Sequence, residues 1–196
     1  MEPPSAPAHS VADVIERLRA IDAALPTTDG VAWFTKLYLR VTEAVEAHVS
    51  DSGAFKDPAF LTRLDVVFAN LFFDAVQADA HDPATVPKAW APLFEARSAK
   101  GIAPIQFAFA GMNAHINRDL PVALVSTCEE LHVDLADAAP ELADFERVNA
   151  LLETTERDVK AWFATGFVGV VDVALGDVDD HVAMWDVGRA RDAAWV

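Results

Sequence analysis

Cysteine is almost missing from this chain of 196 residues, since Cys128 is the only one. A single cysteine excludes a disulfide within the chain and a zinc site built from cysteines. Cys128 lies in an apolar stretch and is predicted to be a core residue. Glycine is also scarce, at 8 residues, whereas hydrophobic residues make up 53% of the chain. Together with the abundance of alanine and leucine, this composition favours helices and excludes a disordered protein.

Basic residues are few: 15 lysines and arginines face 31 aspartates and glutamates, which gives a formal net charge of −16. Such a field repels phosphate groups, so nucleic acids and anionic membrane surfaces are not expected as partners. No apolar run reaches the roughly 18 residues that span a bilayer. The first residues, MEPPSAPAHS, have neither the basic nor the apolar part of a signal peptide, so we expect a cytoplasmic protein.

Several catalytic motifs are missing too. The sequence has no G-x-S-x-G, no Walker A loop, no G-x-G-x-x-G and no H-E-x-x-H. The spacing E-x-x-H, which di-iron helical proteins use twice, occurs once, at Glu129 and His132. We therefore interpret His132 as a histidine at the end of a helix, where its charge is favourable.

What the sequence does contain is helical periodicity. Apolar residues recur at helical spacing, and Ser10, Asp29 and Asp57 are placed to cap helices. The predicted helices cover approximately residues 11–25, 30–49, 58–78, 87–101, 104–120, 122–133, 141–165 and 180–195. A short strand within residues 167–175 is left open. We predict an all-α fold, a single-domain bundle of about seven or eight helices over residues 10–196, around a buried central helix at 58–78. Residues 1–9, with three prolines, are predicted to be a flexible arm.

The most unusual stretch is Pro104–Leu124, which is almost wholly apolar apart from a polar cluster within residues 113–119. A helix places His115 and Asp119 four residues apart on one face. Pro121 is expected to break or kink this helix, because proline lacks an amide donor and displaces the preceding residue, Leu120, from helical angles.

The spacing of His115 and Asp119 fits three interpretations. The pair could bind one divalent metal, with Asp65 as a further ligand. Alternatively, the carboxylate could orient the imidazole and raise its pKa, which makes His115 a general base. In the third interpretation the cluster is structural, and Asp119 caps the helix that restarts after the proline.

The predicted central helix carries three polar residues, Asp65, Asn70 and Asp74, inside the apolar run LDVVFANLFFDAV. A buried carboxylate needs a partner or must take up a proton. For Asp65 the partner is left open between His115, His48, a metal and an arginine. The arginines considered are Arg40, Arg63 and Arg118.

These residues also carry a resemblance. The string Phe109–Asn117 (FAGMNAHIN), followed by Asp119-Leu120-Pro121, resembles a bacterial family of uncharacterised, largely helical proteins, a domain of unknown function. Further similar positions are Leu64–Val66, Phe68–Asn70, Val148-Asn149, Ala190-Arg191 and Ala194-Trp195. The resemblance extends from about Trp33 to Trp195. It implies that six polar residues meet in one place: Asp65, Asn113, His115, Asn117, Asp119 and Asn149.

The sequence thus favours an enzyme that transforms a small, largely apolar molecule by cyclisation, isomerisation or hydrolysis. His115 is the predicted acid and base, oriented by Asp119 or Asp65. The residues predicted to bind the substrate are Asn70, Asn113, Asn117 and Asn149. A non-catalytic ligand-binding or scaffold protein is the alternative. The cofactor is left open between none and a divalent metal on His115, Asp119 and Asp65, and so is the oligomeric state.

Overall fold

The computed structural model describes residues 6–49, 55–134, 137–150, 152 and 187–195. Every regular element in these ranges is a helix, which confirms the all-α bundle. The elements are α1 (Val11–Ala24), α2 (Gly30–Val49), α3 (Pro58–His81), η1 (Pro83–Thr85), α4 (Ala91–Ala96), α5 (Pro104–Ala114), η2 (His115–Asp119), α6 (Leu120–Leu131) and α9 (Val187–Trp195). Residues 139–150 are helical as well. The predicted strand at 167–175 and the second half of the helix predicted over 141–165 lie outside the described residues.

The helices begin where the capping residues predict. The Ser10 hydroxyl accepts from the Asp13 amide at 3.1 Å, and the Asp13 carboxylate accepts from the Ser10 amide at 3.0 Å, which is a capping box. Asp57 accepts from the amide of Phe60 at 2.9 Å, with Pro58 in the first helical position of α3. These local signals fix the start of α1 and α3 before any long-range packing.

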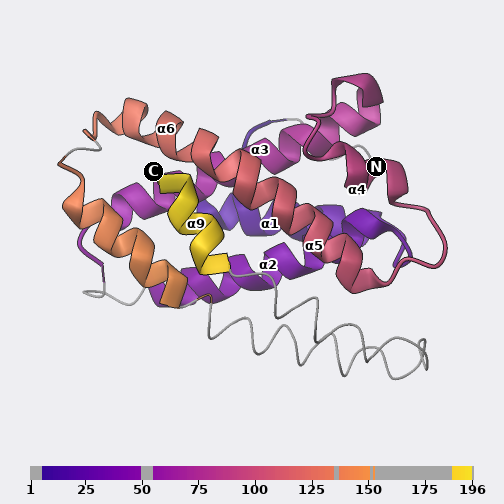
Figure 1. Ribbon diagram of the computed structural model, residues 1–196, viewed down its shortest axis with the longest axis horizontal. Helices are drawn as coiled ribbons and strands as arrows, with labels where there is room; N and C mark the ends of the chain where they lie inside the picture. Colours follow the sequence, from indigo (N-terminus) through magenta and orange to yellow (C-terminus); the bar gives the residue numbers. More distant parts are fainter. Residues whose placement is uncertain (1–5, 50–54, 135–136, 151, 153–186, 196) are drawn as a thin grey trace.

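α3 is the central helix of the bundle. Its residues Val66, Ala69, Phe72 and Phe73 belong to an apolar cluster shared with α1, α2, α4 and α5. Towards its start, α3 contributes to a second cluster, shared with α6, residues 145 and 148, and α9. α5, the turn η2 and α6 run as one continuous rod across the molecule, and α9 packs against α6 and η2 (Figure 1). The rod therefore passes over both parts of the core.

The N-terminal segment is anchored to α3 by Asn70. The Ala8 amide donates to the side-chain oxygen of Asn70 at 2.8 Å, and the Asn70 amide donates to the Ala8 carbonyl at 3.0 Å. Ala8 is itself buried in the first apolar cluster. The arm predicted over residues 1–9 is thus held in place at Ala8. The side chain of Asn70 uses both its oxygen and its amide group in hydrogen bonds to the Ala8 backbone.

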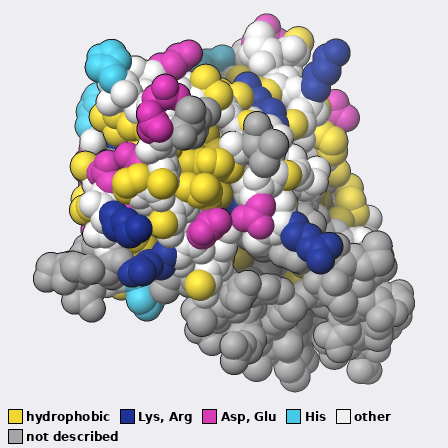
Figure 2. Space-filling model, turned by 60° about the vertical axis from the view of Figure 1, so that its left-hand side comes forward, with side chains coloured by type: hydrophobic (Ala, Val, Ile, Leu, Met, Phe, Trp, Pro, Cys, Tyr) yellow, Lys and Arg dark blue, Asp and Glu magenta, His cyan; other side chains and the backbone are white. Residues whose placement is uncertain are grey.

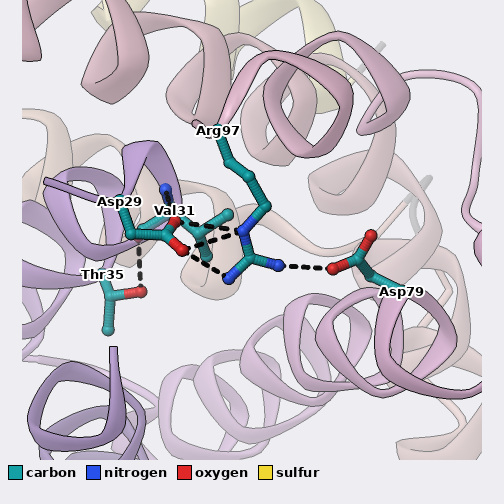
Figure 3. A network of polar contacts seen from close by, with 5 residues as sticks. All are labelled: Asp29, Val31, Thr35, Asp79 and Arg97. Atoms are coloured by element: carbon teal, nitrogen blue, oxygen red, sulfur yellow. Dashed lines mark hydrogen bonds and ion pairs between the residues drawn. The ribbon is translucent and has the colours of Figure 1, made fainter. Parts of the chain in front are cut away.

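A polar network ties the start of α2 to α3 (Figure 3). Asp29 caps α2 by accepting from the Val31 amide at 2.8 Å. The same carboxylate accepts from the Arg97 guanidinium, which also bonds to Asp79 of α3. The Arg97 carbonyl accepts from the Gly30 amide at 2.8 Å. Side chain and backbone of Arg97 together hold this end of the bundle, and paired charges of this kind are strong when partly buried.

None of the described helices is both long and apolar enough to cross a membrane. Figure 2 shows the side of the molecule on which the far end of α6 lies, where hydrophobic side chains gather between acidic and basic ones. α6 contributes exposed apolar side chains, namely Val122, Val125 and Leu131. Cys128, on the same helix, is buried as predicted.

Candidate functional site

The rod formed by α5 and α6 is continuous because η2 is a π-helical turn. The Leu120 amide donates to the His115 carbonyl, five residues back instead of four. A π turn is wider than an α turn, so Pro121, directly after it, does not end the rod. The prediction that Leu120 leaves helical angles is wrong: its φ of −62° and ψ of −46° are helical. Single π turns of this kind are frequent at functional sites.

This turn directs His115 and Asp119 into the core. The His115 Nδ1 lies 3.0 Å from Asp119 Oδ2, and the side chains are 4% and 0% exposed. The Trp90 indole donates to the same carboxylate oxygen at 2.9 Å, and the Arg118 guanidinium donates to Oδ1 at 2.6 Å. Since indole and guanidinium can only donate, Asp119 is the acceptor in both bonds. The structural interpretation expected the Asp119 side chain to cap α6. It does not, because it makes no capping hydrogen bond to that helix.

The hydrogen bond to Asp119 fixes the form of the His115 ring. A carboxylate accepts, so Nδ1 carries the proton and Nε2 keeps its lone pair. Burial lowers the pKa of His115, and the hydrogen bond and charge of Asp119 oppose this without reversing it. Asp119 thus acts on the pKa of His115 in the expected direction, but burial outweighs it and leaves the pKa below its ordinary value. The imidazole is neutral at physiological pH, and its Nε2 is a free base.

Among the described residues, five aromatic rings surround this imidazole. Phe68 is stacked on it, with ring centroids 3.5 Å apart and an angle of 8° between the planes. The other centroids lie at 4.6 Å (Tyr38), 5.7 Å (Phe34), 5.8 Å (Trp90) and 6.3 Å (Phe72). We call this set the aromatic cage. Nε2 is buried within it and has no hydrogen-bond partner in the described part of the chain.

Tyr38 brings a second unpaired polar atom to the cage. It lies on α2, is 6% exposed, and its hydroxyl is buried without a hydrogen-bond partner among the described residues. Burial raises the pKa of Tyr38 well above its usual value, the charges of Asp65 and Asp119 raise it further, and the side chain of Thr42 opposes this without reversing it. The phenol is therefore a neutral donor across the physiological pH range.

Asp65, on α3, acts on Tyr38 of the cage through its charge. Its pKa is raised to about 7, mainly by burial and in addition by the charge of Glu46, whereas the charge of Arg191 opposes the rise. Two of the arginines predicted as its partners are occupied elsewhere, because Arg63 bonds to Glu130 and Arg118 to Asp119. The opposing cation is instead Arg191 of α9, which the sequence did not predict.

The predicted substrate-binding asparagines form their hydrogen bonds with groups other than the imidazole. Asn113 and Asn117 are exposed and bond to each other at 2.8 Å. Asn149 accepts from Arg191 and donates to Asp192 at 2.9 Å, which ties residues 139–150 to α9. Asn70 holds Ala8. Of the residues expected to meet, His115 and Asp119 contact each other in the core, and Asn113 and Asn117 form a separate, exposed pair.

The predicted metal site finds no support in the geometry. Within the described ranges, no three histidine, cysteine, aspartate or glutamate side chains are grouped so that they could hold a metal ion. The His115 Nδ1 is used by Asp119, and Glu129 and His132 are both exposed. We therefore derive no step through a metal.

Sequence reasoning missed Tyr38 and Trp90, although both belong to the site. Tyr38 is one aromatic residue on a long apolar face and carries no spacing signal. Trp90 could have been found, because a buried indole N–H usually has a hydrogen-bond partner. A buried tryptophan and a buried aspartate in one small domain are natural partners.

Comparisons with known proteins place the chain in a group without an assigned activity. The model of one protein family, described as a family of unknown function, matches residues 11–196. No curated protein and no solved structure matches the chain. The geometry of the site is therefore the basis for inferring what it does.

Proposed function

The chain belongs to the family of unknown function DUF5995, and we propose from its site that it is an enzyme that transforms a small, largely apolar molecule by acid–base chemistry. The observation that carries the proposal is the His115 Nε2, a neutral base buried among aromatic rings without a described hydrogen-bond partner. An unpaired buried polar atom costs about 1–3 kcal/mol, and this one is also a base.

Each group around the imidazole has a part in this proposal. Asp119 holds the ring in the form with Nε2 unprotonated and stabilises the imidazolium that forms when Nε2 takes a proton. Trp90 and Arg118 hold Asp119 in place. The low pKa of His115 keeps the base unprotonated until the substrate is present.

The walls of the cage define the substrate class. Aromatic side chains and a stacked imidazole favour an apolar body, and the carboxylates of Asp119 and Asp65 disfavour an anion. Isomerisation, cyclisation and hydrolysis of an uncharged molecule all begin with a proton transfer that such a base can perform. We place this chemistry in the cytoplasm, in line with the single reduced cysteine and the acidic composition.

The test compares His115→Asn with the unaltered protein. The amide of asparagine can keep the bond to Asp119, whereas the base at Nε2 is lost. The probes are cyclohexanone and acetophenone, followed by NMR for uptake of deuterium from D2O, and phenyl acetate, followed for hydrolysis. We expect the protein to accelerate at least one of these reactions, and His115→Asn to lower the rate by about 100-fold or more.

The matched control is His132→Asn, which changes an exposed histidine and should leave the rate unchanged. The proposal fails if His115→Asn keeps the activity, or if no probe reacts faster than in buffer.

A non-catalytic ligand-binding or scaffold protein is the second candidate, and one observation favours it. Asp119 accepts from Trp90, His115 and Arg118 at once, an arrangement that joins the segment before α4 to the central rod. On this reading, Asp119→Ala unfolds the protein or lowers its melting temperature strongly, whereas the probes do not react. Loss of turnover in His115→Asn at an unchanged melting temperature would decide against it.

A further inference from the structure

Tyr38 and His115 are neighbouring rings, and each carries one buried polar atom without a described hydrogen-bond partner. Their ring centroids are 4.6 Å apart with 67° between the planes. The hydroxyl of Tyr38 and the Nε2 of His115 are both buried, and neither has a hydrogen-bond partner among the described residues. Two such atoms on touching rings are unusual, because buried polar groups are nearly always paired.

The two atoms differ in what they can do. The phenol of Tyr38 can donate a hydrogen bond, and the lone pair of Nε2 can accept a proton. A carbonyl compound matches both, since its oxygen accepts from the phenol while a proton on the adjacent carbon faces the base. Phe34 and Phe72 also contact the Tyr38 ring, with centroids at 5.7 and 6.1 Å, and hold it in place.

We infer that Tyr38 is a catalytic residue that donates its O–H to the carbonyl oxygen of an uncharged, enolisable substrate while His115 Nε2 removes the proton from the neighbouring carbon. The inference rests on the proposed function and names its substrate class. In this step the C–H bond breaks and its proton moves to Nε2. The electron pair forms a C=C bond, the carbonyl π pair moves to oxygen, and the phenol stabilises the resulting oxyanion by hydrogen bonding. Return of a proton to the same carbon gives exchange, and in a β,γ-unsaturated ketone return of the proton to the γ-carbon completes an isomerisation.

An uncharged substrate follows from the charges around the pair. Asp119 bonds to His115, and the charges of Asp65 and Asp119 both act on Tyr38. An anionic substrate would meet two carboxylates, whereas a neutral ketone gains a negative oxygen only as the reaction proceeds. The phenol then acts on the charge where it develops, and this is the most effective place for a donor.

The experiment is deuterium uptake by cyclohexanone and acetophenone in D2O, with Tyr38→Phe compared with the unaltered protein well below the melting temperature. We expect the rate of exchange to fall by about 100-fold, mainly in kcat. The melting temperature should stay the same or rise, because the variant loses a hydroxyl with no described partner. Thr127→Val is the matched control: it removes another buried, unpaired hydroxyl, on α6, and should keep the rate.

The outcomes separate this inference from the proposed function. Exchange that His115→Asn abolishes and Tyr38→Phe leaves unchanged overturns the role of Tyr38 alone. Hydrolysis of phenyl acetate without exchange of either ketone overturns the substrate class and leaves the acid–base function standing. A Tyr38→Phe variant with a full rate and a lowered melting temperature shows that the hydroxyl serves only the fold. No reaction with any probe overturns both.

Discussion

Asp119 and Asp65 are two carboxylates of the same core with different surroundings. Asp119 is fully buried and accepts hydrogen bonds from Trp90, His115 and Arg118. Asp65 has one buried oxygen without a hydrogen-bond partner among the described residues, and its pKa is raised to about 7. Donors stabilise a buried charge, and without them burial favours the protonated form. This difference makes Asp119 the carboxylate that can stabilise an imidazolium.

The raised pKa of Asp65 predicts how Asp65→Asn changes stability. A carboxyl group whose folded-state pKa lies above its unfolded value of 3.8 contributes stability that is complete below about pH 4 and is lost as the pH rises through about 7. Asparagine carries no charge, so the variant should gain stability relative to the unaltered protein between about pH 4.5 and pH 8.5, by roughly 1–4 kcal/mol. Guanidinium unfolding at both pH values measures this.

Glu129→Gln is the control for Asp65→Asn, since it removes a negative charge from an exposed position of α6. Its effect should change little between the two pH values. A pH-independent effect of Asp65→Asn, or a variant that is less stable at the higher pH, would mean that Asp65 is ionised in the folded protein and paired with Arg191.

The part of the site that lies within one helix could be predicted from the sequence, because helical spacing determines which side chains are in contact. The contacts between helices could not. His115 and Asp119 follow from the helical spacing of four residues. Asn113 and Asn117 are each two residues from one of this pair, and two residues turn a helix by about 200°, so both face away. That error could have been avoided from the sequence alone. Tyr38 could not have been found, because its role depends on how α2 packs against the rod.

The rod shows the same limit for a whole element. The bounds of α2 agree with the prediction, and α1 and α3 begin where their caps lie. Pro121 led to the expectation of a break, because the rule for proline assumes an α-helix on its N-terminal side. Here the turn before Pro121 is a π turn, which contains one more residue than an α turn, so the rule does not apply. A π turn carries no composition signal, so the sequence did not reveal the feature that directs His115 inward.

α2 and α5 pack closely because each presents a glycine to a phenylalanine of the other. A Cβ added to Gly111 of α5 would lie 2.3 Å from the Phe34 ring of α2, and one added to Gly30 would lie 2.4 Å from the Phe107 ring of α5. Distances this short cannot be accommodated without a shift of a ring. Since Phe34 is also a wall of the aromatic cage, this packing sets the shape of the site.

Gly111→Ala should therefore destabilise the protein although alanine is the better helix former. Replacing glycine by alanine gains about 1 kcal/mol in helix propensity. Forcing an added methyl group into a filled core typically costs about 1–3 kcal/mol, which opposes this gain. We expect a net loss of up to about 2 kcal/mol in the free energy of unfolding, measured in denaturant.

Phe34→Leu supplies the matched test for Gly111→Ala. The smaller side chain leaves room for the added methyl group, so the double variant should be more stable than the sum of the two single effects predicts. Additive effects would show that Phe34 is not the residue that the methyl group displaces. A Gly111→Ala variant as stable as the unaltered protein would contradict the close packing itself.

The charge of the molecule as a whole is large for its size. A net charge of −16 on 196 residues produces repulsion that opposes the compact state. The described ion pairs offset part of it, including the network of Arg97 with Asp29 and Asp79 (Figure 3). On the side shown in Figure 2, acidic and basic side chains lie among one another, so the repulsion on this side does not come from one acidic patch.

Salt should therefore stabilise this protein. Raising the ionic strength from about 10 mM to about 0.1 M shortens the screening length from about 30 Å to about 10 Å, which weakens repulsion between distant charges more than attraction within ion pairs. We expect the melting temperature to rise by a few degrees over this range, measured by calorimetry at constant pH. Sodium and potassium chloride should act equally, because screening depends on ionic strength and not on the identity of the ion. A rise with only one of the two salts would indicate a bound ion instead, and a fall would mean that attraction within the ion pairs outweighs the repulsion of the net charge.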